Sequence, residues 1–203
     1  MSQRLALNGV RFAVLCIMTS SLLALVSRAQ GVPVAEISKE GTSFKFTVKA
    51  SIKVAGTFDK WDATLTFTSP DVTTAVLDIK IQAATVDTGS GMKNNKLKGK
   101  DFFDVKQNPL ITFRSTKIIQ TGSNTFEVDG EFTIRGVTKP EKLALDLERS
   151  GPGVGVITGV MAFDRKEFGM NSGIPFIKVA DRVEVNVDLR YKRISGPPPV
   201  LKP

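Results

Sequence analysis

Residues 86–113 read VDTGSGMKNNKLKGKDFFDVKQNPLITF, and they interrupt a chain that otherwise alternates apolar and polar residues. Ser90 has a side chain that can cap a helix, and Gly99 is a residue type at which helices commonly end. The adjacent aromatic residues Phe102 and Phe103 follow, and Asn108 then precedes a proline, which favours extended backbone. The segment therefore predicts a short helical insert, with an aromatic pair behind it, in a chain of β-strands.

A helical insert in a β chain either caps the sheet or covers what the sheet encloses, and we expect a cover. Leu97, Phe102 and Phe103 are the candidate lid residues at the mouth of the fold. Two roles stay open for these side chains. They either touch a bound molecule or plug the end of the sheet as a hydrophobic contact.

The flanking residues predict strands, because apolar and polar residues alternate with a period of two. The alternation begins at Phe44, is interrupted at Gly56, and is clearest in VLDIKIQ at residues 76–82. It continues beyond the insert, with a bend or bulge expected at Gly130. Residues 164–175 lack the alternation and are expected to form a loop.

About eight or more short strands of this kind imply an antiparallel sheet with one buried face. A sheet of that many strands hides the face by curling or pairing, so we expect an all-β barrel or sandwich with a short helical insert. The buried face forms either an ordinary packed core or, in a barrel of about eight strands, a space for one small ligand. The candidate ligand-binding residues of this face are Phe46, Val48, Val54, Phe67, Leu77, Ile79, Ile81, Phe113, Phe132, Ile134, Leu145, Val185 and Val187.

The N-terminus has the pattern of a secretory signal peptide. A positively charged start precedes an apolar run at residues 12–26, and small residues precede a cleavage site expected after Ala29. Removal of residues 1–29 leaves a single domain at 30–194 and a proline-rich, flexible tail at 195–203 with nothing to pack against. Export to the periplasm, or secretion, follows from this interpretation.

The composition excludes several classes of function. Loss of the leader removes three arginines and no acid, so the formal charge falls from +8 to +5. These charges are not interleaved with the aromatic residues that stack bases, which argues against nucleic-acid binding. The chain has no histidine and its one cysteine lies in the leader, so the usual general base, thiol nucleophile and metal ligands are missing. We expect no catalytic residue, no metal site and no cofactor.

Several separated motifs resemble the YceI-like family. The resemblance extends over roughly residues 37–192, and the motifs occur in order. They are VDTG at 86–89, NNKLKGKDFFDV at 94–105, PLITF at 109–113, GEFTIRGVTKP at 130–140, FDR at 163–165, FGM at 168–170 and VADRVEV at 179–185.

The resemblance implies a lipocalin-like, extended antiparallel β-barrel of about eight to ten strands, exported to the periplasm. Its interior is expected to hold a polyisoprenoid, such as a quinone tail, or a related amphiphile. One departure concerns the helical insert, where the family commonly has an aspartate and a histidine and this chain has Asn94 and Lys96. We therefore assign no polar contact with a ligand head group to this segment.

The charges around the insert have structural explanations. Its four lysines either steer an anionic or membrane-borne amphiphile or form a solvated helix face, and the pattern favours the solvated face. Transient contact with a membrane surface stays an alternative. The lysines are Lys93, Lys96, Lys98 and Lys100, and roles in caps, turns or the surface are expected for Asp87, Asp101, Asp104, Arg135 and Lys139.

The sequence thus predicts a periplasmic binding or carrier protein that sequesters a polyisoprenoid or similar amphiphile without catalysis. A transmembrane β-barrel of the outer membrane is the alternative, although one Trp and one Tyr are too few to form aromatic girdles. An enzyme acting on a lipid inside the barrel is a further alternative, which the missing histidines disfavour. Nothing in the sequence indicates the oligomeric state.

Overall fold

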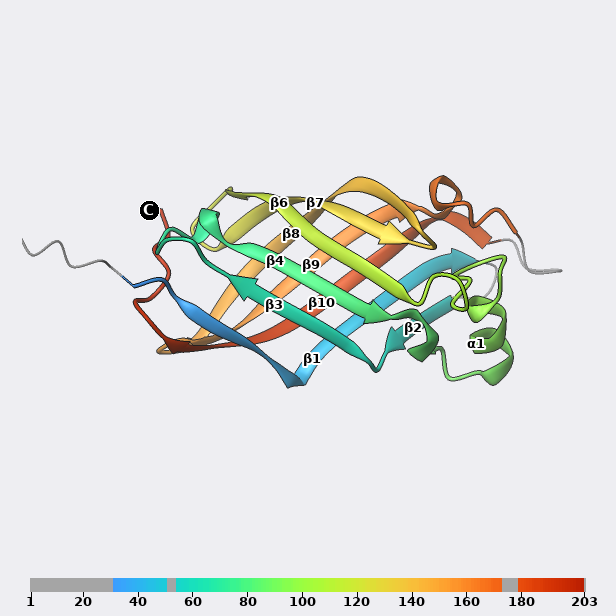
Figure 1. Cartoon of the computed structure of the whole chain (residues 1–203), viewed down its shortest axis with the longest axis horizontal. Helices are drawn as coiled ribbons and strands as arrows, with labels where there is room; N and C mark the ends of the chain where they lie inside the picture. Colours follow the sequence, from blue (N-terminus) through green and yellow to red (C-terminus); the bar gives the residue numbers. More distant parts are fainter. Residues whose placement is uncertain (1–30, 51–53, 173–178, 203) are drawn as a thin grey trace, which may run out of the picture.

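The computed structural model describes residues 31–50, 54–172 and 179–202, which form one elongated barrel (Figure 1). The predicted leader lies outside these residues. Within them, no helix is both long and apolar enough to cross a membrane. The elements are β1 Val34–Ala50, β2 Val54–Phe58, β3 Trp61–Thr66, η1 Val72–Thr74, β4 Val76–Gln82, η2 Ala83–Thr85, β5 Val86–Asp87, α1 Gly91–Lys98, β6 Leu110–Gln120, β7 Thr125–Ile134, β8 Val137–Gly151, β9 Val154–Asp164, η3 Arg165–Phe168 and β10 Val179–Ser195.

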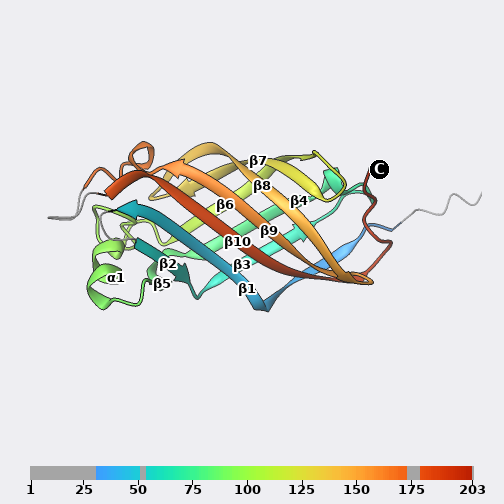
Figure 2. The same cartoon turned by 180° about the vertical axis from the view of Figure 1, so that it is seen from behind.

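Eight strands close into the barrel. Neighbours are antiparallel in the order β10-β9-β8-β7-β6-β4-β3-β1, and β1 pairs again with β10 to complete the ring. Strands β2 and β5 extend the sheet beyond β1 at one end, beside α1 (Figures 1 and 2). The prediction of an all-β antiparallel barrel of about eight to ten strands with a short helical insert is confirmed.

The barrel wall separates an apolar interior from a charged outer face. In β4, Leu77, Ile79 and Ile81 belong to the buried core. Between them, Asp78 faces outward, and its carboxylate lies 2.6 Å from the guanidinium of Arg114 on β6. Since successive residues of a strand point to opposite faces, the period of two in the sequence corresponds to the two faces of the wall.

Strand β1 begins well before the point that the alternation predicts. It starts at Val34 rather than at Phe44, and its register with β10 shifts between Ser38 and Ser43. Gly41 lies in this bend with a φ of 74°, a conformation that glycine adopts without a steric penalty. The bend interrupts the alternation, and for that reason the sequence pattern missed the first half of the strand.

Gly56, which was expected to interrupt a strand, and Gly130, where a bend or bulge was expected, both lie within strands. Gly56 is in β2 beneath the ring of Phe46, and Gly130 is in β7 beneath the ring of Phe113. A Cβ at Gly130 would lie 2.4 Å from that ring, and a Cβ at Gly56 would lie 2.6 Å from the ring of Phe46. The irregularity expected at Gly130 is in the facing strand β6, just after Ser115. The glycines therefore provide space for interior aromatic rings.

The segment after β9, expected to be a loop, contains the short helix η3. Asp164 caps this helix, because its carboxylate accepts a hydrogen bond from the backbone N–H of Lys166 at 2.8 Å. The helix directs Phe168 into the interior, where its ring centroid lies 5.4 Å from Phe132 and 5.2 Å from Phe163. The end of the expected loop lies outside the described residues.

The C-terminal tail packs against the barrel end opposite α1 (Figure 1). The N–H of Val200 donates to the carbonyl of Pro70 at 2.8 Å, and the Val200 carbonyl accepts from the N–H of Val72 at 3.1 Å. Leu201 packs against the core. The prediction of a tail with nothing to pack against is wrong, because an extended segment can pair its backbone with the neighbouring η1 turn without any periodic sequence signal.

Candidate ligand-binding cavity

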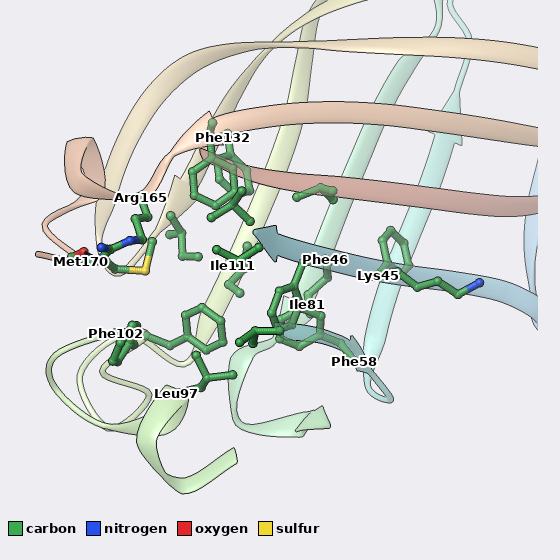
Figure 3. A pocket seen from close by; sticks show the side chains of 18 of the residues that line it. Lys45, Phe46, Phe58, Ile81, Leu97, Phe102, Ile111, Phe132, Arg165 and Met170 are labelled. Atoms are coloured by element: carbon green, nitrogen blue, oxygen red, sulfur yellow. Dashed lines mark hydrogen bonds between the residues drawn. The ribbon is translucent and has the colours of Figure 1, made fainter. Parts of the chain in front are cut away.

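The barrel interior is hollow at the end where α1 lies (Figure 3). We call this cavity of about 90 Å³ the outer chamber. Lys45 borders it, but its amine points away and pairs with Asp188 at 3.5 Å. The other lining residues are Phe44, Phe46, Val48, Val54, Phe58, Ile81, Leu97, Phe102, Phe103, Ile111, Phe132, Ile134, Phe163, Arg165, Met170, Val179, Val183 and Val185.

A second cavity of about 40 Å³, the inner chamber, lies deeper in the barrel. It is lined by Phe44, Ile79, Ile81, Ile111, Thr112, Phe113, Phe132, Leu143, Met161, Val185 and Val187. Five residues border both chambers, and we call them the constriction ring: Phe44, Ile81, Ile111, Phe132 and Val185. The two chambers are therefore consecutive parts of one apolar interior.

The lid consists of Leu97 in α1 and of the turn that follows this helix. The turn winds back because the N–H of Phe102 donates to the carbonyl of Gly99 at 3.1 Å and the N–H of Phe103 donates to the carbonyl of Leu97 at 3.0 Å. Both phenylalanines are buried, at 5% and 7% exposure. The ring of Phe103 faces that of Phe46 at a centroid distance of 6.4 Å. All three predicted lid residues thus border the outer chamber, and Figure 3 labels two of them, Leu97 and Phe102.

Asn94 and Lys96 form hydrogen bonds within the lid. The side-chain oxygen of Asn94 accepts from the N–H of Thr88 at 2.8 Å, and its NH₂ group donates to Asp87 at 3.1 Å. The amine of Lys96 lies 2.8 Å from the carboxylate of Asp101. The pKa of Asp87 lies below its ordinary value because a backbone N–H and the Asn94 amide donate to it. These polar groups stabilise the lid and do not line the outer chamber.

The helix α1 is partly exposed: Gly91, Met92 and Asn95 are exposed, and the other five residues are half-buried. It lies between Ser90 and Gly99 as predicted, although the side chain of Ser90 makes no capping hydrogen bond. None of its residues is buried, and Met92 is 85% exposed. Leu97 alone packs against the core from this helix. Tertiary contacts at Leu97 and in the following turn therefore hold the helix in place.

Arg135 connects the lid to the turn between β7 and β8. Its backbone has a φ of 55°, and its guanidinium donates to the carbonyl of Lys100 from Nε at 3.3 Å and from Nη2 at 3.0 Å. The expectation of a simple surface charge is therefore incomplete for Arg135. Lys139, by contrast, forms an exposed ion pair with Glu167 at 3.4 Å.

Arg165 is a buried cation beside the outer chamber, with 6% exposure. Its guanidinium donates to the carbonyls of Met170, Ser172 at 3.0 Å and Ala180 at 3.2 Å, and to the carboxylate of Asp181 at 3.1 Å. A guanidinium has five N–H donors, so these contacts use most of them. Arg165 therefore joins the segment after η3 to the start of β10 and is not free to bind a ligand.

The predicted interior residues all belong to the core or pack against it, but they fall into three groups. Those lining the outer chamber are Phe46, Val48, Val54, Ile81, Phe132, Ile134 and Val185. Those lining only the inner chamber are Ile79, Phe113 and Val187. Phe67, Leu77 and Leu145 line neither chamber and pack in or against the core, so their assignment as ligand contacts stays a prediction.

Several residues that line the chambers were not among those predicted from the sequence. In the outer chamber they include Phe44, Phe58, Ile111, Phe163, Arg165, Met170, Val179 and Val183. In the inner chamber they include Thr112, Leu143 and Met161. Phe44, Ile111 and Val183 lie in alternating strands, so the same periodicity was sufficient to identify them. Arg165 and Met170 lie in and after η3, where no periodic signal exists.

The chambers are small compared with a long chain. A water molecule requires about 10–15 Å³ of such a volume, so the inner chamber of about 40 Å³ has space for about three waters. Typical ligand sites measure about 300–1,000 Å³. A long apolar chain therefore enters only if the lining side chains, many of them phenylalanines, move apart.

A larger groove, of about 430 Å³, lies on the outer wall. It is lined by Lys39, Asp59, Lys60, Trp61, Asp62, Lys80, Gln82 and Leu110. Its charged lining suits an apolar ligand poorly, so the smaller interior chambers are the better candidate site. In the part of the chain that the structure describes, no three His, Cys, Asp or Glu side chains gather where they could hold a metal ion.

The sequence matches the YceI-like domain over residues 36–191. It is 32% identical over 108 residues to a UPF0312 protein of Pseudomonas savastanoi pv. phaseolicola, an overlap of 51% of this chain and 56% of that relative. A UPF0312 protein of Shewanella baltica is 26% identical over 145 residues, 66% of this chain and 75% of the relative. The chain thus spans little more than half the length of the first of these relatives.

Solved structures share the fold. BcnA of Burkholderia cenocepacia superposes with a TM-score of 0.70 at 26% identity, covering 76% of this chain and 99% of BcnA. A structure described as a polyisoprenoid binding domain from Saccharophagus degradans superposes with a TM-score of 0.64, covering 79% of this chain and 99% of that domain. The latter pair is 12% identical, so this likeness concerns the fold alone.

Proposed function

The chain belongs to the YceI-like family, and from this premise we propose that it sequesters a polyisoprenoid, or a similar long apolar amphiphile, inside its barrel. The observation that carries the proposal is the apolar outer chamber beneath a lid that includes Phe102 and Phe103. Family and fold together support a binding protein rather than an enzyme. The ligand is expected to fill the interior as cargo, not as a cofactor.

In this proposal, the affinity comes from burying the apolar chain of the ligand. Each methylene moved from water into the chamber contributes about 0.8 kcal/mol, of which part is lost to immobilising the ligand. The neighbouring fold from Saccharophagus degradans is described as polyisoprenoid binding, which supports the same ligand class for this chain. Most N–H donors of Arg165, which lines the outer chamber, are already bonded within the protein, so the proposal favours no particular head group, such as that of a quinone.

Export is part of the proposal. The predicted leader at residues 1–29 directs the protein to the periplasm, or to secretion, where it carries the lipid between membranes. The only cysteine of the chain lies in that leader, so the mature domain folds without a disulfide in an oxidising compartment.

The outer face of the barrel argues against an outer-membrane protein. A transmembrane β-barrel presents a band of apolar side chains to the lipid. Here, outward positions in the middle of strands carry ion pairs, such as Lys142 with Glu127 at 2.5 Å and Arg114 with Asp78 at 2.6 Å. The absence of histidine likewise leaves the alternative of a lipid-modifying enzyme without its usual general base.

The proposal predicts that the protein carries an extractable lipid. Protein released by osmotic shock and purified without detergent is expected to yield a polyprenyl compound by mass spectrometry of an organic extract. A protein of similar size purified in parallel from the same cells controls for lipid carried along non-specifically. An empty protein that also takes up no added quinone would contradict the proposal, and a protein that stays with the membranes would favour the outer-membrane alternative.

Transient contact of the lid with a membrane surface is the second part of the proposal. Lys93 is a half-buried residue of α1, Lys100 is exposed just after this helix, and each basic residue near an anionic surface contributes about 1 kcal/mol. The double variant Lys93→Glu/Lys100→Glu is expected to acquire a prenol from anionic vesicles about tenfold more slowly at low salt. Lys117→Glu/Lys192→Glu, on exposed strand positions, is the matched control. Equal rates for the two double variants would remove the membrane contact from the proposal.

A further inference from the structure

We propose that the barrel interior is a blind tunnel, entered from the lid end, in which the inner chamber sets the length of apolar chain that binds. This inference rests on the proposed function and adds which residues limit the ligand. Three features of the interior carry it: the constriction ring, the packed layer beneath the inner chamber, and the closed far end.

The constriction ring lies where the two chambers meet. Its residues come from five different strands, β1, β4, β6, β7 and β10, so it surrounds the interior. Its two aromatic rings are each in contact with further aromatic side chains. Phe44 contacts Trp61 at a centroid distance of 5.2 Å, and Phe132 contacts Phe163 at 5.0 Å and Phe168 at 5.4 Å. A ligand chain that enters the inner chamber must move these rings apart against the aromatic contacts that hold them.

The interior beneath the inner chamber is packed. Leu77, Val128 and Leu189 have 2% exposure or less. Gly159 lies where the inner chamber meets this layer, and a Cβ added there would lie 2.8 Å from Leu145 Cδ2, 3.1 Å from Leu143 Cδ1 and 3.4 Å from Val187 Cβ. Even one methyl group therefore meets its neighbours at this level. The end of a bound chain is expected to stop above this layer.

The far end of the barrel is closed. Phe67 and Ala75 are buried there, and Leu201 of the C-terminal tail packs against the core. The backbone hydrogen bonds of Val200 with the segment around η1 hold this tail in place. α1 and the tail lie at opposite ends of the molecule (Figures 1 and 2). The apolar chain of the ligand must therefore enter and leave the tunnel beside the lid.

A blind tunnel has a measurable consequence for affinity. Each isoprene unit that enters buries five carbon atoms and is expected to raise the affinity at least about tenfold, after the costs of ordering. Units beyond the capacity of the two chambers stay in water and add nothing. Affinity is thus expected to rise with chain length and then to reach a plateau.

The test uses delipidated full-length protein and a series of prenols. The probes are geraniol, farnesol, geranylgeraniol and solanesol, in order of increasing length, with binding followed by calorimetry. Trp61 provides a second signal, because it is the only tryptophan of the chain and contacts Phe44 of the constriction ring. The wild-type protein is expected to reach its plateau before solanesol.

Substitutions in the inner chamber are expected to move the plateau. Val187→Phe fills this chamber, so the plateau shifts to a shorter prenol, and the longer prenols lose more affinity than the shortest one. Leu143→Ala enlarges the chamber and shifts the plateau to a longer prenol. Val183 borders only the outer chamber, so Val183→Phe is the matched control and is expected to weaken the binding of every prenol. If Val187→Phe fails to fold, the opposite shift of the plateau expected for Leu143→Ala still tests the proposal.

The outcomes separate the inference from the proposed function. Wild-type affinity that still rises at solanesol, or a Val187→Phe variant that weakens all prenols alike, would overturn the blind tunnel and leave lipid binding intact. Failure of the wild-type protein to bind any prenol would overturn the proposed ligand class and, with it, the inference.

Discussion

The Ile79→Arg variant is expected to be unfolded at room temperature, or folded but unable to take up lipid. Ile79 is 4% exposed, lines the inner chamber, and pairs across the sheet with Ala63 and Phe113. An unpaired charge in such a place costs several kcal/mol, which is comparable to the total stability of a domain, about 5–15 kcal/mol. Urea unfolding and prenol binding provide the measurements.

A matched variant distinguishes burial from the mere addition of an arginine. Gln82→Arg places the same side chain at an exposed position of the same strand, β4, and is expected to change the stability by less than about 0.5 kcal/mol. Wild-type stability and full lipid uptake in Ile79→Arg would mean that β4 presents its other face to the interior.

The Arg165→Met variant is expected to lose about 3 kcal/mol or more of the free energy of unfolding. Methionine fills much of the arginine volume but leaves the carbonyls of Met170, Ser172 and Ala180 without their donor, and unsatisfied buried groups cost about 1–3 kcal/mol each. Asp181 contributes less to this loss. The hydrogen bond from Lys166 is the main cause that lowers the pKa of Asp181, and Arg165 has a smaller effect. In the variant, Asp181 therefore keeps Lys166 as its partner.

Arg114→Met is the control for this variant. Arg114 also pairs with an aspartate, Asp78 at 2.6 Å, but its side chain is 62% exposed. Such surface pairs contribute roughly 1 kcal/mol or less, so a small change is expected. Chemical denaturation with two spectroscopic probes measures both variants. Equal losses in the two would show that Arg165 does not join the segments beside the outer chamber.

The local pattern of the sequence predicted much of the barrel wall. The alternation in β4 assigned Ile79 and Ile81 to the interior, and Ser90 and Gly99 bounded the helix α1. The pattern failed where the backbone departs from it. The bend at Gly41 hid half of β1, since a register shift breaks the period of two.

The lid was partly predictable. Leu97, Phe102 and Phe103 could be identified because they are large apolar residues in a segment that is otherwise basic and irregular. The contacts that hold the lid were not predictable, since the bond from Arg135 to the carbonyl of Lys100 spans 35 residues of the chain. Which side chain meets a distant carbonyl depends on how the strands close into the ring, and no local pattern records this.

The sequence by itself determined the class of fold, the inward face of most strands and the family, because each of these depends on residue type at short, regular spacing or in separated motifs. Only the tertiary structure decided which inward residues line a cavity. Leu77 and Ile79 are two positions apart on the same face of β4, yet Ile79 lines the inner chamber and Leu77 lies in the packed layer beneath it. A cavity is the volume that side chains from many strands leave unfilled, so strand register, barrel closure and the positions of the phenylalanine rings together determine where it lies.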